Sequence, residues 1–306
     1  MESKTQARTT EERVMAALAH GSVLISLFGP LGAGSVWISQ RRKSRYAVFQ
    51  SLQAMGYQAF LLWVGLTVVL GGVLVFLFSD VLPFVKTSTA MGGLSFHSLM
   101  AQAARFQTIL LGVWGILCLP GLIGAVLALM GREYYYPWLG RQLETHLAAE
   151  SDGAWFNEER EDDFVAGICH ASAVVVFWGM ILPWLVWTSQ KDRSKRLRFQ
   201  ALQAFLFQLL MLVSFGLAFI LLFGMMALVV ALAQYMNSPA GIASDAGLYV
   251  IIAVFVMLAF MCILLLALPA YHLFALIAWA RTGRGQSYRY PVLGKFLARR
   301  MREGDG

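Results

Sequence analysis

Six long stretches without a charged side chain divide the sequence, and short polar segments rich in Arg, Lys, Asp and Glu separate them. A helix needs about 20 mostly apolar residues to cross the hydrocarbon of a membrane. Lipid offers no partner to an unpaired backbone amide, so apolar stretches of this length favour helices. The pattern predicts an all-α polytopic membrane protein. The stretches are residues 14–38, 46–79, 106–130, 164–188, 199–235 and 246–280.

The second half of the chain repeats the first. Residues 11–58 and 161–208 align without a gap, with 16 identities in 48 positions. Each copy also closes with Gly-Arg followed by Tyr-Pro-x-Leu-Gly. Internal repetition at a fixed period indicates two copies of one structural unit. The sequence therefore predicts two homologous repeats.

The composition agrees with a membrane location. Of the 306 residues, 58% are hydrophobic and 13% are charged, and the mean hydropathy is +0.65. The first apolar stretch is too long for a cleaved signal peptide. We expect a multi-pass protein of the cytoplasmic (inner) membrane.

Basic residues follow the first apolar stretch of each copy. The positive-inside rule assigns such loops to the cytoplasmic side. Three crossings per copy would invert the second copy and place one basic loop on the wrong side. An even number of crossings per copy avoids this and places both termini in the cytoplasm. The residues expected at the membrane surface are Arg41, Arg42, Lys43, Arg45, Lys191, Arg193, Lys195 and Arg196.

A break in the first stretch of each copy makes an even number of crossings feasible. Copy one carries Gly29-Pro30, and copy two carries Gly179 and then Pro183. Proline removes an amide donor and glycine permits a bend. We predict that each repeat is a broken, re-entrant helical hairpin followed by two transmembrane helices. An ordinary kinked transmembrane helix is the alternative.

These arguments divide the chain into five parts. Residues 141–163 hold eight of the 17 acids and are expected to form a solvated linker that can also pair with the basic loops. The predicted parts are a cytoplasmic N-terminal tail (1–13), membrane repeat 1 (14–140), an acidic cytoplasmic linker (141–163), membrane repeat 2 (164–294) and a basic C-terminal tail (295–306).

The repeated motifs resemble a known family. They run from His20 through the Gly/Pro break and the basic loop to a Phe-Gln-x-x-Gln-Ala helix, and end at Tyr136-Pro137. This order resembles a bacterial membrane family of unknown function that is similar to the central membrane subunit of the chloroplast inner-envelope protein translocon. The resemblance implies two such modules in tandem, with a role in moving or assembling proteins at a membrane.

Polar side chains inside the apolar stretches are the candidate site. His20 and His170 occupy equivalent positions, where a histidine needs a partner. Metal binding, proton transfer and a hydrogen bond that holds the hairpin all remain open for them. In each copy two glutamines share one helical stripe and a third lies beside it, and they form either packing contacts between helices or a polar cavity between the repeats. These glutamines are Gln50, Gln53, Gln58, Gln200, Gln203 and Gln208.

Aromatic and proline residues near the ends of the apolar stretches are expected to anchor the chain at the membrane interface. Anionic lipids at the cytoplasmic face are expected partners of the basic residues, and other membrane proteins are further candidates. The basic residues adjoin apolar spans, which argues against nucleic acid. The expected anchors are Trp37, Trp187, Tyr136, Pro137, Tyr290 and Pro291.

The apolar stretches contain no carboxylate, and the chain has no nucleotide-binding or hydrolase motif. We therefore expect no enzyme, no cofactor, no catalytic residue and no metal site. The leading hypothesis is a non-enzymatic membrane module of translocon-like type, which assists membrane-protein insertion or assembly or acts as a scaffold. The alternative is a small-solute or ion channel or carrier with a cavity between the repeats lined by Gln and His.

Overall fold

The computed structural model describes residues 8–81, 96–148, 156–190, 194–236 and 246–303, and these contain helices and no strand. The first repeat comprises α1 (Thr10–Gly21), η1 (Ser22–Phe28), α2 (Gly29–Gln40), α3 (Arg45–Phe76), η2 (Leu77–Val81), α5 (Phe96–Leu129) and α6 (Leu139–Leu147). The second comprises α7 (Glu158–Ala171), η3 (Ser172–Val174), α8 (Ile181–Ser189), α9 (Lys195–Met236), α11 (Ala246–Thr282) and α12 (Leu293–Glu303).

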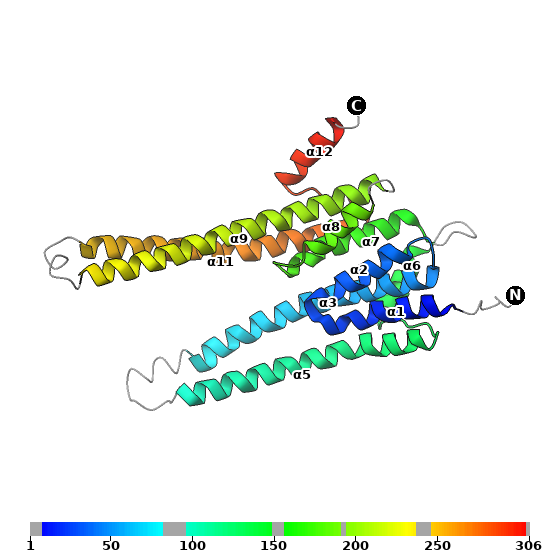
Figure 1. Ribbon diagram of the computed structural model, residues 1–306, viewed down its shortest axis with the longest axis horizontal. Helices are drawn as coiled ribbons and strands as arrows, with labels where there is room; N and C mark the ends of the chain where they lie inside the picture. Colours follow the sequence, from blue (N-terminus) through cyan, green and yellow to red (C-terminus); the bar gives the residue numbers. More distant parts are fainter. Residues whose placement is uncertain (1–7, 82–95, 149–155, 191–193, 237–245, 304–306) are drawn as a thin grey trace.

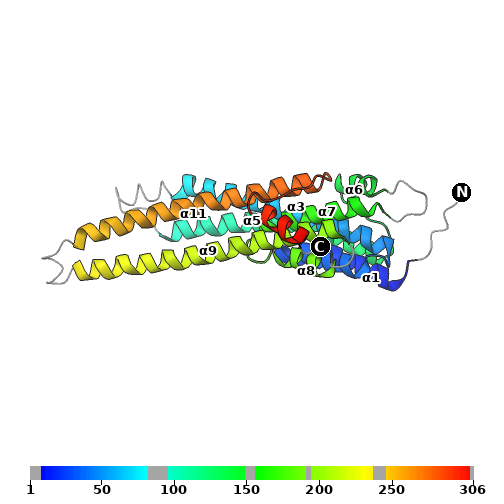
Figure 2. The ribbon, with the colours of Figure 1, turned by 90° about the horizontal axis from the view of Figure 1, so that it is seen from above.

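The two repeats lie side by side along their long axes. In each, two long helices run together toward the same end of the molecule, α3 with α5 and α9 with α11 (Figure 1). The short helices α1, α2, α6, α7 and α8 gather at the other end. The view from above shows the same division (Figure 2). The predicted fold class is thereby confirmed: an all-α protein with two homologous repeats.

The first apolar stretch folds back on itself. A straight helix over residues 10–40 would separate its ends by about 45 Å at 1.5 Å per residue. Instead, the side-chain amide of Gln40 donates to Glu11 at 3.2 Å, and the Ser44 hydroxyl donates to Glu12 at 2.7 Å. The start and the end of this stretch are therefore neighbours, and the stretch is a hairpin.

The hairpin turns within η1, where the backbone leaves the helical region at Ile25 and at Ser26, whose φ is 46°. The return helix α2 begins at Gly29 with Pro30 in its first turn. Proline suits this place because the first-turn amides have no partner within the helix. In repeat 2 the turn follows η3, and α8 returns with Pro183 in its first turn.

Within the described residues, five stretches are long and apolar enough to cross a membrane. One of them is the folded segment Thr10–Gln40, and the others lie on α3, α5, α9 and α11. Helices α1 and α2 have 12 residues each, which is about 18 Å. That is short of the roughly 30 Å hydrocarbon layer. A hairpin of this depth whose ends meet does not cross, so the spans are the two long helices of each repeat.

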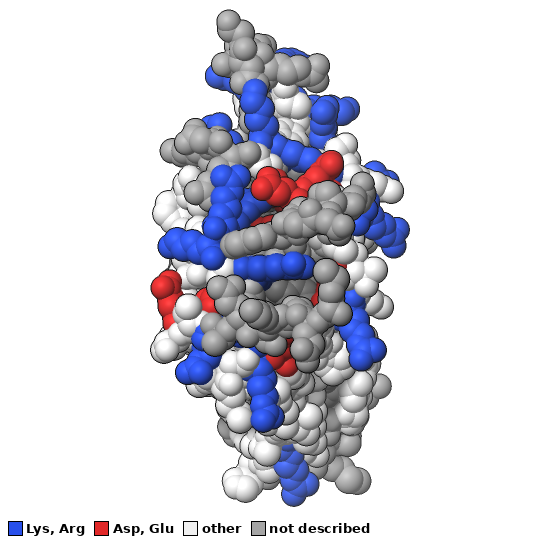
Figure 3. Space-filling view, turned by 90° about the vertical axis from the view of Figure 1, so that its right-hand side faces the viewer, with Lys and Arg blue, Asp and Glu red and all other residues white. Residues whose placement is uncertain are grey.

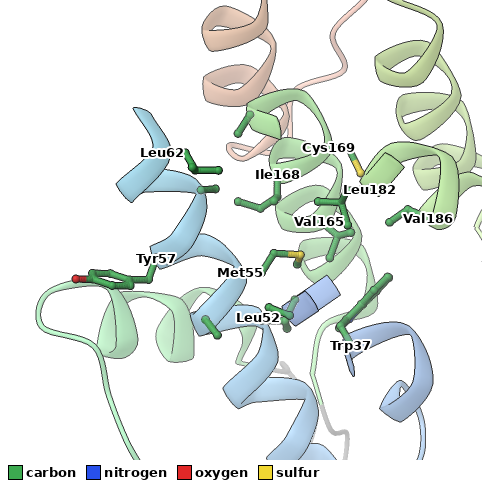
Figure 4. Close-up of a cluster of buried hydrophobic side chains, with 14 of the residues drawn as sticks. Trp37, Leu52, Met55, Tyr57, Leu62, Val165, Ile168, Cys169, Leu182 and Val186 are labelled. Carbon is green, nitrogen blue, oxygen red and sulfur yellow. The ribbon is translucent and has the colours of Figure 1, made fainter. Parts of the chain in front are cut away.

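The repeats meet through their hairpins and the adjoining part of α3. Figure 4 shows Met55 and Leu62 of α3 directed toward Val165 and Ile168 of α7, and all four are almost fully buried. Across the same seam the Trp63 indole donates to the carbonyl of Ala171 at 2.9 Å. Lipid is as apolar as these side chains, so close packing and hydrogen bonds hold the seam at membrane depth.

The hairpin geometry predicts which residues share a side of the membrane. Cysteines introduced at Lys43 and Lys195, in a background with Cys262→Ser, should react with an impermeant thiol reagent from the same side. The reason is that both positions lie at the end where the short helices gather. A cysteine at Gln234, which is exposed near the far end of α9, should react from the opposite side. Labelling of Lys43 and Lys195 from opposite sides would contradict the hairpin.

Candidate functional site

A buried histidine links three segments of repeat 1. His20, at the end of α1, is fully buried. Its Nε2 lies 2.8 Å from Oε1 of Gln50 on α3, and its Nδ1 lies 3.0 Å from the hydroxyl of Tyr136, which follows α5. Because Oε1 only accepts, Nε2 carries the proton and Nδ1 accepts from the tyrosine. Both ring nitrogens of a neutral imidazole are satisfied.

The same arrangement recurs in repeat 2. His170 is also fully buried, with Gln200 Oε1 at 3.1 Å from Nε2 and the Tyr290 hydroxyl at 3.2 Å from Nδ1. The Gln200 amide continues the network by donating to the carbonyl of Tyr288 at 3.1 Å. Each histidine thus ties its hairpin to the first long helix and to the segment that closes its repeat.

The last glutamine of each stripe secures the hairpin turn. The Gln58 amide donates to the carbonyl of Ala19 at 3.0 Å, and the Ser22 hydroxyl lies 2.8 Å and 3.0 Å from the carbonyls of Ala19 and Gly29. These contacts satisfy carbonyls that the end of α1 leaves without a helical partner.

Repeat 2 secures its turn with the equivalent residues. The Gln208 amide donates to the carbonyl of Cys169 at 3.0 Å, and the Ser172 hydroxyl lies 2.8 Å from the carbonyls of Cys169 and Gly179. A side chain at Gly179 would come within 2.0 Å of the Ser172 carbonyl. The turn therefore requires glycine at this position.

The middle glutamine of each stripe holds the closing Tyr-Pro segment. Gln53 accepts from the amide of Tyr136 at 3.3 Å and donates to the carbonyl of Tyr134 at 3.1 Å. Gln203 makes the same pair with Tyr290 and Tyr288, both at 3.1 Å. A Cβ at Gly140 would lie 2.5 Å from Gln53 Oε1, which explains the glycine that ends this motif.

The histidines and glutamines do not line a cavity between the repeats, as the channel hypothesis requires. All eight side chains are at most 3% exposed, and the hydrogen bonds that these side chains make stay within one repeat. The stripes also do not face each other across the seam. Among the described residues, no group of three His, Cys, Asp or Glu side chains could together hold a metal ion.

A buried ionic cluster joins the repeats at the end where the short helices gather, which we call the charged end. Arg41, which follows α2, has its Nε 3.1 Å from Glu161 and a terminal nitrogen 2.6 Å from Asp162. Its other terminal nitrogen donates to Gln190 at 2.7 Å. The Trp37 indole donates to Glu161 at 2.7 Å. Burial raises the pKa of Glu161, opposed by Arg41 and by the Trp37 hydrogen bond.

A second cluster lies within repeat 2. Arg196, on the first turn of α9, contacts Asp163 at 2.7 Å and Glu159 at 2.5 Å, and donates to the carbonyl of Gly285 at 2.6 Å. Burial raises the pKa of Asp163 to about 6, against the lowering effect of Arg196. The expectation of a solvated linker is therefore wrong for Glu161, Asp162 and Asp163, which are buried because each has a cationic or indole partner.

Several expected surface residues lie inside the protein. The anchor role does not fit Trp37, Tyr136 and Tyr290, because all three are at most 2% exposed and bonded to buried polar groups. Trp187 is partly exposed and stacks on Phe205, and both motif prolines, Pro137 and Pro291, are exposed.

The basic residues expected at the membrane surface likewise include both buried and exposed side chains. Arg41 is not a membrane-surface residue, because it is 9% exposed and surrounded by carboxylates. Arg196 is partly buried in its own cluster, whereas Arg42, Lys43, Arg45 and Lys195 are exposed. Lys191 and Arg193 lie outside the described residues.

Sequence reasoning missed two residues of the network, Ser22 and Ser172. A signal was present, because serine stands at this position in both copies, next to the histidine-containing segment. The partner of each histidine in the closing motif was missed as well. The sequence pattern predicts Tyr136 and Tyr290 at the membrane interface, whereas the structure places their hydroxyls at the ring nitrogens.

Comparison with known proteins identifies one family. Residues 11–143 and residues 161–297 each match the model of the magnetosome magnetite crystal formation protein family. The two matches cover the two repeats and confirm the duplication. None of the curated proteins or solved structures compared with the chain matches it.

Removing one hydroxyl should weaken repeat 1. Tyr136→Phe leaves Nδ1 of His20 buried without a donor, which should destabilise the protein by about 1–3 kcal/mol. Thermal unfolding in detergent, followed by tryptophan fluorescence, measures the loss. Tyr135→Phe is the matched control, because that hydroxyl bonds only to exposed carboxylates. Equal losses in the two variants would argue against the buried network.

Removing Arg41, the cation buried between the repeats, should destabilise the protein more than the loss of the Tyr136 hydroxyl. Arg41→Ala leaves two buried carboxylates without their cation, and such a change typically costs about 3–5 kcal/mol. Arg42→Ala, at the neighbouring position, removes a side chain that is 57% exposed and should change stability by less than about 0.5 kcal/mol. An equal decrease in unfolding temperature in the two variants would contradict the buried cluster.

The raised pKa of Asp163 predicts a pH dependence. Since the folded protein holds this proton more tightly than the unfolded chain, the carboxyl favours the folded state below about pH 4 and loses this contribution as the pH rises through 6. Relative to wild type, Asp163→Asn should therefore gain in melting temperature from pH 4 to pH 7. Glu158→Gln, on the same helix but exposed, should show no such trend. If the difference in melting temperature between Asp163→Asn and wild type stays constant from pH 4 to pH 7, a raised pKa of Asp163 is excluded.

Proposed function

This chain belongs to the magnetosome magnetite crystal formation protein family, and from that premise we propose that it is a non-catalytic membrane module that supports the formation of magnetite crystals. It acts by organising the membrane and the membrane proteins around the crystal. The integral membrane character follows from four long apolar helices and two hairpins.

One observation carries the non-catalytic assignment. The buried polar side chains that sequence reasoning selected as a candidate site serve the architecture of each repeat. The histidines, glutamines and serines bind the hairpin, its turn and the closing motif. This use of the polar interior favours a rigid module over a reactive centre, and it opposes the channel hypothesis.

The charged end is the surface that we propose for contacts with other proteins. The start of α1, the basic segment Arg41 to Arg45 after α2 and the acidic start of α7 come together there (Figure 1). The positive-inside rule supports a cytoplasmic location for this end, and hence for both termini. A role in assisting the insertion or assembly of other membrane proteins is the finer form of the proposal, and the tandem duplication of a membrane module supports it.

Deletion in a magnetite-forming bacterium that carries this chain tests the crystal role. Loss of the protein should change the size or number of magnetite crystals seen by electron microscopy, and the wild-type chain should restore them. Arg41→Ala should restore them less well than Arg42→Ala when both are produced at equal levels. Unchanged crystals after deletion would remove the proposal.

Photocrosslinking tests the scaffold role. A photoreactive residue at Lys195 or Arg299, both exposed at the charged end, should capture other membrane proteins. The same residue at Ile220, which is 70% exposed on the apolar part of α9, should capture lipid. Solute flux through the purified protein in liposomes, without protein crosslinks, would favour the channel instead.

A further inference from the structure

The seam between the repeats joins two different faces of the repeated unit. Along much of the seam, α3 and α6 of repeat 1 meet α7 and η3 of repeat 2. Because the chain is a duplication, each repeat carries both faces and uses one of them in the seam. The face of repeat 1 recurs on repeat 2 as α9 and α12, which we call the trailing face. The face of repeat 2 recurs on repeat 1 as α1 and η1, which we call the leading face.

The trailing face is exposed where its counterpart in the seam is buried. Met55 and Trp63 of α3 are 0% and 9% exposed. The residue of α9 equivalent to Trp63 is Val213, which is 60% exposed. The residue equivalent to Met55 is Phe205, which is partly exposed. The side of α9 that corresponds to the seam side of α3 is therefore open.

The leading face shows the same difference. Glu161 and Ile168 of α7 are 5% and 1% exposed, because repeat 1 covers them. Their equivalents on α1 are Glu11, which is exposed, and Leu18, which is 57% exposed. Each half of the seam thus has an uncovered duplicate elsewhere in the chain.

An unpaired hydrogen-bond donor lies beside the trailing face. In the seam, the Trp37 indole donates to Glu161 at 2.7 Å. The equivalent indole of Trp187 has no acceptor within the described residues, and a buried donor without an acceptor costs free energy. Trp187 stacks on Phe205 of the trailing face. The carboxylate equivalent to that of Glu161 is Glu11, which belongs to the leading face.

The two open faces are kept apart within one chain. Figure 1 shows α2, α3 and α7 between α1 and α9. A contact between the faces therefore requires two chains. Because the faces differ, such a contact is heterologous, and it leaves one face of each kind free for a further chain.

We propose that a second copy of this chain docks its leading face on the trailing face of the first and repeats the contact that joins the two repeats. Leu18 of the incoming copy packs against Phe205. Glu11 of that copy accepts from the Trp187 indole after this partly exposed ring turns toward it. Lipid is as apolar as these side chains, so close packing and the hydrogen bond hold the copies together.

The assembly has a defined orientation. The two repeats share one orientation in the membrane, so a copy added through the same contact has its charged end on the same side. Figure 3 shows this end, where Lys and Arg side chains surround a smaller number of Asp and Glu. A row or ring of copies presents these charged ends side by side. The contact is independent of the role in crystal formation.

Cysteine crosslinking in the membrane tests this contact. Leu18→Cys and Phe205→Cys are placed in separate full-length chains with different tags, both with Cys262→Ser, and the two chains are produced together. A short bifunctional thiol reagent should give a product that carries both tags. The reason is that Met55 and Ile168, the equivalents of Phe205 and Leu18, are directed toward each other in the seam (Figure 4).

A matched position on the same helix separates docking from random collision. Ile220 is 70% exposed on α9, and its equivalent Leu70 is 53% exposed and thus outside the seam. Ile220→Cys with Leu18→Cys should therefore give no product. Absence of the product that joins Leu18→Cys to Phe205→Cys overturns the proposal, as does an equal yield from Ile220→Cys. A product from two Phe205→Cys chains in place of the mixed one would indicate a twofold dimer and overturn the head-to-tail contact.

Oligomer size gives a second test that needs no cysteine. Single-molecule photobleaching of the labelled full-length protein in lipid bilayers counts the copies in each assembly. Wild type should form dimers and larger assemblies. Leu18→Ala with Phe205→Ala should weaken self-association on the order of tenfold, because both packed side chains are lost. Leu217→Ala with Ile220→Ala, at exposed positions farther along α9, should leave it unchanged. A wild type that stays monomeric, or an equal loss in the two double variants, would overturn the proposal.

Discussion

A helix broken at membrane depth leaves carbonyl groups that lipid cannot satisfy, and each repeat of this protein answers that constraint with the same two side chains. A serine hydroxyl and a glutamine amide reach the carbonyls at the break, Ser22 with Gln58 in repeat 1 and Ser172 with Gln208 in repeat 2. An unsatisfied polar group in hydrocarbon costs several kcal/mol. With these bonds in place the first segment can turn back instead of crossing.

The larger architecture follows from that turn. A first segment that returns to its own side leaves two crossings in each repeat, so the second repeat has the same orientation as the first. The basic loop of repeat 1 and the acidic start of repeat 2 therefore lie at the same end, where Arg41 meets Glu161 and Asp162. This buried pairing fixes how the repeats sit against each other, and it concentrates the exposed charge where contacts with other proteins are proposed.

Much of the fold was predictable from the sequence, because duplication and charge are read along the chain. Matched basic loops after two broken segments required an even number of crossings, and the glutamine spacing placed three amides on one side of a helix. The partners were beyond this reasoning. Spacing defines a helix face but does not say what lies opposite it, so Gln50 was expected across the repeats and instead binds His20 in its own repeat. Likewise, nothing local distinguishes the buried Arg41 from the exposed Arg42. Only the carboxylates 120 residues later do so.

A distance across the first hairpin tests this account most directly. Spin labels are attached to cysteines at Glu11 and Arg42, both exposed at the ends of the hairpin, in a background with Cys262→Ser, and pulsed electron paramagnetic resonance measures their separation in a lipid bilayer. The hairpin predicts a short separation, close to the length of the two label side chains. A separation of about 45 Å, the length of a straight helix over these residues, would contradict it.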